Sequence, residues 1–116
     1  MQGREYTQNN MYRLDLQTFN WDSVGTRSEG EENSIPSQID EHTVCLNDNN
    51  KAIIFGGFID GERTNKIYQF DLDTHRWSLI KPAGGDSATA PTPRAGHSAS
   101  LLNNALYVFG GKNDEN

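Results

Sequence analysis

Short apolar runs separated by polar turns dominate the chain, and no segment shows the 3.6-residue period of an amphipathic helix. The runs at 42–47, 52–57, 66–72 and 76–80 read HTVCLN, AIIFGG, KIYQFDL and RWSLI. KIYQFDL alternates apolar and polar side chains, as a strand with one buried face does. Asp and Asn residues between the runs favour tight turns. The pattern predicts an all-β chain with four short antiparallel strands in 42–81.

The pattern recurs along the chain with a period near 55 residues. Aromatic, acidic, histidine and glycine positions repeat at spacings of 54 to 56: Tyr12 with Tyr68, Asp15 with Asp71, Trp21 with Trp77, His42 with His97, and Gly56-Gly57 with Gly110-Gly111. Length changes between the copies fall in loops, as in repeat architectures. A four-stranded unit of about 50 residues matches a β-propeller blade.

These motifs carry a family resemblance. A double glycine after an apolar strand, then a loop, Tyr68 and Trp77 nine residues on, resembles the Kelch repeat, and PRAGHSASLL at 93–102 resembles the start of a Kelch blade. The resemblance covers nearly the whole chain outside the loops, although SQIDEH replaces PRAGH before His42. It implies structural roles for the motif residues. The tyrosine and tryptophan of each blade, including Tyr12 and Trp21, are expected to pack between blades, and His42 and His97 to bond a nearby backbone or loop group.

The resemblance divides the chain into parts of blades. We expect strands 3 and 4 of a split blade in 1–23, a long loop in 24–41, a complete central blade in 42–81, a second long loop in 82–96, and strands 1 and 2 of a following blade in 97–116. These are about two blades' worth of strands, whereas propellers have four to eight blades. Two accounts stay open: three copies close a six-bladed ring (a four-copy ring being next), or a longer parent chain supplies the other blades.

Charge and composition narrow the partners. The net charge of −6 argues against nucleic acid, whose phosphates require a basic stripe, and against anionic membranes. No stretch approaches 18 consecutive apolar residues. The single cysteine, Cys45, cannot form an intramolecular disulfide and fits a reducing, cytoplasmic setting.

The sequence predicts no catalytic residue, no metal site and no cofactor. Cys45 lies three residues from His42 on a predicted strand, so the two side chains should project from opposite faces. Only three histidines are present, and no phosphate-binding, dinucleotide or paired-carboxylate signature appears. Cys45 is therefore expected to be a buried structural thiol.

Long loops are expected on one propeller face only. Loops joining strands 2–3 and 4–1 (23–40, 58–65 and 81–96) are long, whereas the turns on the other face are minimal. Arg27, Arg63 and Arg94 come from three of these loops and are expected to bind carboxylates of a partner. We therefore predict a Kelch-repeat module that binds a protein or peptide through this face. The alternatives are a propeller-fold enzyme with a site at the pseudo-axis and an architectural fragment of a larger protein.

Overall fold

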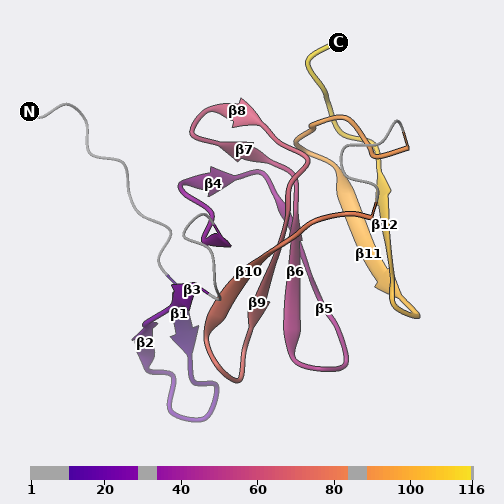
Figure 1. Ribbon diagram of the computed structural model, residues 1–116. Helices are drawn as coiled ribbons and strands as arrows, with labels where there is room; N and C mark the ends of the chain where they lie inside the picture. The colour runs from indigo at the N-terminus through magenta and orange to yellow at the C-terminus, as the bar shows by residue number, and fades with distance from the viewer. Residues whose placement is uncertain (1–10, 29–33, 84–88, 116) are drawn as a thin grey trace, which may run out of the picture.

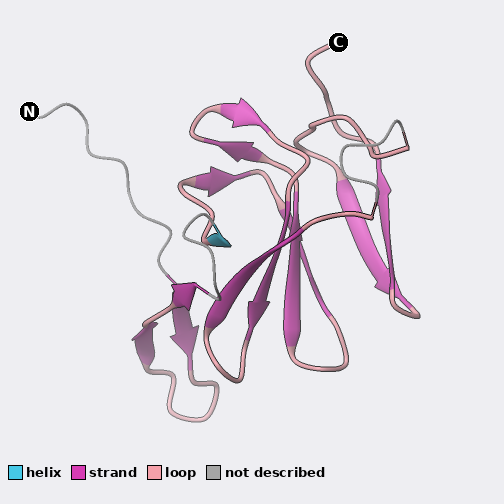
Figure 2. Cartoon of the chain, viewed as in Figure 1, coloured by secondary structure: helices cyan, strands magenta, loops and turns pink. Residues whose placement is uncertain are grey.

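Strands joined by turns and loops make up this computed structural model, which describes residues 11–28, 34–83 and 89–115 (Figures 1 and 2). The central blade has four antiparallel strands in the spatial order β5, β6, β9, β10. Their bounds are Thr43–Leu46, Lys51–Phe55, Ile67–Asp71 and Arg76–Ile80. The all-β blade architecture predicted from the sequence is confirmed. Within the described ranges, no helix has the length and apolar character needed to span a bilayer.

Two further antiparallel hairpins flank the central blade on opposite sides (Figure 1). β1 (Met11–Leu14) pairs with β2 (Trp21–Val24), and β11 (Ser98–Leu102) pairs with β12 (Ala105–Phe109). β11 lies against β5 of the central blade. By their place in the repeat, β1 and β2 are the outer two strands of one blade, and β11 and β12 are the inner two strands of another.

The core lies between the central sheet and the β1–β2 hairpin. Ile54, Tyr68, Phe70 and Trp77 are buried in it, and Met11 of β1 packs against them. Tyr68 and Trp77 meet edge to face, with 6.3 Å between ring centroids. Burial of these aromatic surfaces stabilises the packing of the central sheet against the hairpin.

The same turn closes the β1–β2 and β9–β10 hairpins. Asp71 Oδ1 accepts hydrogen bonds from the backbone of Asp73 (2.9 Å) and Thr74 (3.2 Å). Asp15 Oδ1 accepts from Gln17 and Thr18 at 2.8 and 3.2 Å. These backbone bonds lower the pKa of both aspartates. The repeated Asp is thus a turn residue, because its carboxylate satisfies amides that the tight turn leaves open.

The loops contain strands beyond those predicted from the sequence. β3 (Arg27–Ser28) adds to the outer edge of the central blade, parallel to β10. β4 (Ile39–Asp40), β7 (Phe58–Ile59) and β8 (Glu62–Arg63) form a separate antiparallel sheet at the end of the blade (Figure 1). Asp60 and Gly61, both at positive φ, make the two-residue turn between β7 and β8.

Candidate partner-binding face

His97, immediately before β11, docks the following hairpin onto the central blade. Its side chain is buried, and its Nε2 lies 3.0 Å from Phe55 O and 3.0 Å from Thr43 Oγ1. A carbonyl oxygen only accepts, so Nε2 carries the proton and donates to Phe55. The imidazole also meets the Phe55 ring edge-on, with 5.2 Å between centroids. We call the contact surface formed by Thr43, Phe55 and Gly56 the histidine seat.

The double glycine leaves space for two chain segments. A Cβ on Gly56 would lie 2.5 Å from His97 Cε1, so any other residue there would displace the imidazole. A Cβ on Gly57 would lie 2.4 Å from Asp40 O, in the segment that leads into the same blade. Gly57 also donates its N–H to Arg94 O at 2.8 Å. The absence of a side chain at Gly56 therefore lets His97 of the following hairpin approach closely. The absence of one at Gly57 lets the backbone of Asp40 and His42, which leads into the central blade, approach closely.

Arg94 ties a long loop to the end of β12. Its guanidinium donates to Gly110 O at 3.1 Å (Nη1) and to Thr92 Oγ1 at 3.1 Å (Nη2). A further bond runs from Nε to Thr92 O at 3.1 Å. Three of the five guanidinium N–H groups are thus used within the chain, which gives Arg94 an architectural role.

Arg63 also has internal contacts. Its Nη1 donates to Asp114 Oδ1 at 3.0 Å, and the guanidinium lies over the Phe58 ring, 4.8 Å from its centroid. The side chain is only 22% exposed. This arginine therefore fastens residues 113–115 to β8 through an ion pair and a cation–π contact.

Arg27 lies away from the other two arginines. It is exposed in β3, its N–H donates to His75 O at 3.1 Å, and its strand partner is Arg76. His75 belongs to the turn at the start of β10, whereas the loop ends that Arg63 and Arg94 hold lie beyond the far end of that strand. Contrary to the prediction from the sequence, Arg27 therefore does not share one face with Arg63 and Arg94, because β3 forms at the turn end of the blade.

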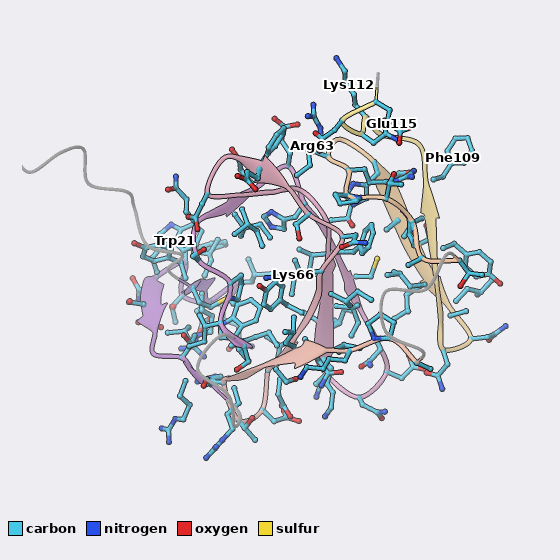
Figure 3. The ribbon with its side chains drawn as sticks, turned by 45° about the horizontal axis from the view of Figure 1, so that its top comes forward. Trp21, Arg63, Lys66, Phe109, Lys112 and Glu115 are labelled. Atoms are coloured by element: carbon cyan, nitrogen blue, oxygen red, sulfur yellow. The ribbon has the colours of Figure 1, made fainter. Side chains whose placement is uncertain are left out.

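The long loops nevertheless form one connected surface. We define the loop face as β4, β7 and β8 together with residues 89–94 and 110–115. Asn113 Nδ2 donates to Thr92 Oγ1 at 3.2 Å, Asn65 Nδ2 to Pro91 O at 2.9 Å, and Ala95 pairs with Lys112. Figure 3 shows Arg63, Lys112 and Glu115 gathered at this end of the molecule. The described residues of this face and its β7–β8 turn include five carboxylates and three cations, so the face has an excess of negative charge: Asp40, Asp60, Glu62, Asp114 and Glu115 against Arg63, Arg94 and Lys112.

Sequence reasoning missed the links that build this face. The Asp60-Gly61 pair is a known hairpin signal and could have revealed β7 and β8. The pairings of Arg63 with Asp114 and of Thr92 with Asn113 join residues far apart in sequence, and no local pattern encodes them.

Cys45 is only half-buried in β5, where burial was expected. Ile53 is its partner on β6. No group of three His, Cys, Asp or Glu side chains within the described ranges is arranged to hold a metal ion.

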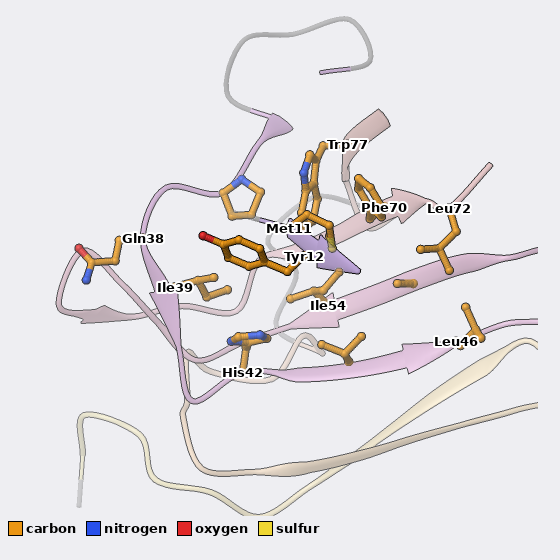
Figure 4. A pocket seen from close by; sticks show the side chains of 13 residues that line it. Met11, Tyr12, Gln38, Ile39, His42, Leu46, Ile54, Phe70, Leu72 and Trp77 are labelled. Atoms are coloured by element: carbon orange, nitrogen blue, oxygen red, sulfur yellow. The ribbon is translucent and has the colours of Figure 1, made fainter. Parts of the chain in front are cut away.

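A large apolar groove lies on the opposite side of the central blade from β11. Its volume is about 730 Å³, and Figure 4 shows His42, Leu46, Ile54 and Trp77 among its walls. Val44 and Ala52 complete the wall formed by β5 and β6. His42 Nδ1 is buried without a hydrogen-bond partner in the described part of the chain. Burial lowers the pKa of His42, and Asp40 partly opposes this effect.

Comparison with known proteins decides the family. The KLHDC2/KLHL20/DRC7 Kelch-repeats domain matches residues 1–116. The chain belongs to the Kelch-repeat family. Kelch repeats generally serve as protein-interaction modules, and the predicted resemblance is confirmed.

Curated relatives of this Kelch chain are much longer proteins. Host cell factor 2 of Homo sapiens is 35% identical over 112 residues, which are 89% of this chain and 13% of that protein. Kelch domain-containing protein 3 of Bos taurus is 32% identical over 108 residues, 85% of this chain and 27% of that protein. Tip elongation aberrant protein 3 of Schizosaccharomyces pombe is 29% identical over 119 residues, 95% of this chain and 10% of that protein. The chain thus spans about a quarter or less of their lengths.

Proposed function

We propose that this Kelch-repeat chain binds a protein or peptide partner through the loop face. The observation that carries the proposal is the set of bonds by which Arg63, Arg94 and Asn113 join separate loops into one surface. A surface that is held in place before binding loses less conformational entropy on association than loose loops do. Among the described residues, the turn end of the blades carries the short hairpin connections and the two-residue strand β3.

The chemistry of the face favours a partner with basic side chains. The sequence predicts that the arginines bind partner carboxylates, whereas Arg63 and Arg94 already bond Asp114, Thr92 and Gly110. Exposed carboxylates such as Glu62 and Glu115 remain on the rim and can pair with Lys or Arg of a partner.

We infer that the module is not an enzyme and acts without a cofactor. Nothing specific among the described residues favours the propeller-fold enzyme that was the alternative. We further propose that the protein is cytoplasmic and that its blades close into a ring: either three copies of this chain complete six blades, or a longer parent chain supplies them.

Reversing charge on the loop face tests the proposal. Glu62→Lys with Glu115→Lys should abolish capture of the partner that the unmodified chain retains from cell extract. Asp48→Lys with Asp73→Lys is the matched control, because it makes the same charge change at the turn end. Equal retention by both variants, or equal loss, would refute a role for the loop face.

A further inference from the structure

Thr92 of the loop face is the only serine or threonine of the chain that a proline follows directly. It is exposed, lies outside the strands, and stands between Pro91 and Pro93. A residue that precedes proline is held in an extended conformation, and protein kinases that select Ser-Pro or Thr-Pro bind their substrates as extended segments. Thr92 therefore combines the sequence with the open, extended backbone that such a kinase needs.

The hydroxyl group of Thr92 faces hydrogen-bond donors. Its Oγ1 accepts hydrogen bonds from Arg94 Nη2 at 3.1 Å and from Asn113 Nδ2 at 3.2 Å. No acceptor for its hydroxyl hydrogen is found in the described part of the chain. Two donors directed at one oxygen, one of them charged, form an environment that suits an anion better than a neutral hydroxyl group.

Arg94 is held in position to receive a phosphate on Thr92. Its Nε donates to Thr92 O at 3.1 Å and its Nη1 to Gly110 O at 3.1 Å, so the guanidinium is fixed from two sides. A phosphate on Oγ1 adds three acceptor oxygens and a charge of about −1.5 to −2 at pH 7. Hydrogen bonds between a guanidinium and a phosphate are about twice as strong as bonds between neutral groups. The carboxylate of Asp114 on the same face is paired with Arg63 at 3.0 Å, which limits its repulsion of the phosphate.

We propose that Thr92 is a phosphorylation site, that Arg94 holds the phosphate, and that the modification regulates partner binding at the loop face. A proline-directed kinase carries out the reaction with ATP and Mg²⁺. The hydroxyl oxygen of Thr92 forms a bond to the γ-phosphorus of ATP, the bond from that phosphorus to the β,γ-bridging oxygen breaks, and ADP leaves. The hydroxyl proton passes to a base of the kinase.

The regulatory part rests on the proposed function of the loop face. The phosphate takes over the bonds that Oγ1 of Thr92 accepts, and it thereby links residues 89–94 to 110–115 through a charged acceptor. It also adds negative charge to a face that already carries an excess of carboxylates, among them Asp114 and Glu115. A partner that presents Lys or Arg side chains should therefore bind the phosphorylated chain more tightly, because the attraction between opposite charges increases.

Incorporation of phosphate tests the site itself. The folded chain is incubated with a purified proline-directed kinase, ATP and Mg²⁺, and intact-mass measurement with peptide mapping identifies the product. We expect a single phosphoryl group, on Thr92, and none in Thr92→Val. Thr74→Val, which removes an exposed hydroxyl group at the turn end, is the matched control and should be phosphorylated like the unmodified chain. Failure of the folded chain to accept phosphate at Thr92 would overturn the proposal.

The pKa of the attached phosphate tests the contact with Arg94. Phosphorus NMR of the folded chain should give a second phosphate pKa below the value of about 6 found in flexible segments, because the guanidinium favours the dianion. The carboxylate of Asp114 acts in the opposite direction, but it is paired with Arg63. A synthetic phosphopeptide of residues 89–96 gives the reference without any variant that has to fold, and in phosphorylated Arg94→Gln the pKa should rise. A phosphate pKa equal to that of the peptide, or unchanged by Arg94→Gln, would refute the contact.

Peptide binding tests the regulation. A synthetic lysine-rich peptide should bind the phosphorylated chain about two- to fivefold more tightly than the unmodified chain, as one added exposed ion pair allows. High salt should remove this difference, because it screens exposed charges. Equal affinities at low salt would refute the regulatory part, whereas phosphate incorporation and the phosphate pKa would still establish the site. The Glu62→Lys and Glu115→Lys variants test the loop face separately, since they leave Thr92 and Arg94 unchanged.

Discussion

Gly57→Ala adds only one methyl group, yet we expect it to destabilise the fold strongly. Gly57 lies at φ +91°, and a Cβ there would be 2.4 Å from Asp40 O and 2.8 Å from His42 N. Both atoms belong to backbone, so no side-chain rotation relieves the overlap. Movement of this backbone would break the Gly57 N–H bond to Arg94 O, 2.8 Å long, or the pairing of β4 with β7.

The magnitude has two parts. A non-glycine residue at positive φ costs about 1–2 kcal/mol, and forcing a methyl group into a packed site costs about 1–3 kcal/mol more. The free energy of unfolding should therefore fall by about 2–5 kcal/mol for Gly57→Ala. Gly61→Ala separates the two parts, because Gly61 has a similar φ of +86° and open space around its Cβ among the described residues. It should cost only about 1–2 kcal/mol.

Urea unfolding followed by tryptophan fluorescence measures both values, because Trp77 is buried and reports loss of the core. The slope of the transition should stay constant, so that midpoints can be compared directly. Equal losses of unfolding free energy for the two variants would refute the close-approach explanation. Gly57 would then be required only because its backbone adopts a positive φ.

Two other predictions follow from burial. Trp77→Ala should lower the free energy of unfolding by about 3–5 kcal/mol. Trp21 is 67% exposed, so Trp21→Ala should lower the free energy of unfolding of the single chain by well under half as much. Equal losses in urea unfolding of the monomer would contradict this difference. Burial holds the folded pKa of His42 below its ordinary value of 6.5, so its protonation favours the unfolded chain. The stability that neutral His42 contributes to the folded chain should be fully present above pH 6.5. It should decrease as the pH falls toward the folded pKa of His42. His42→Asn should show a smaller loss of stability between pH 7 and 5 than the unmodified chain, and parallel pH curves would exclude the effect.

The blade itself could be predicted from sequence because its signals are local and repeated. Tyr68, Phe70 and Trp77 fall on one face by simple alternation, and their burial follows from it. The positive φ of Asn103 and Asn104 matches the tight turn expected of that pair. The period near 55 residues then locates the other two hairpins without any knowledge of tertiary structure.

The loop face could not be predicted in the same way, because its contacts join distant residues. Arg63 is available to a partner only if Asp114, 51 positions away in the sequence, does not pair with it. Arg94 donates to the carbonyl oxygen of Gly110, which follows β12. The position of Arg27 depends on β3, a two-residue strand without an apolar pattern of its own. Charge alone shows that such residues are polar and does not show which neighbours they will meet.

β3 has a consequence for how blades resist aggregation. The outermost strand of a blade presents unpaired backbone groups that can recruit strands of other molecules. Arg27 and Ser28 occupy that edge beside Arg76 and Trp77, and they do so in parallel orientation, while Ser78–Ile80 have no β3 partner. β3 therefore covers part of the exposed edge of β10 and keeps other strands from pairing there. Deleting Arg27 and Ser28 while keeping β4 should leave the partner-binding surface intact and still make the protein prone to sheet-to-sheet polymerisation, which binding assays would not detect.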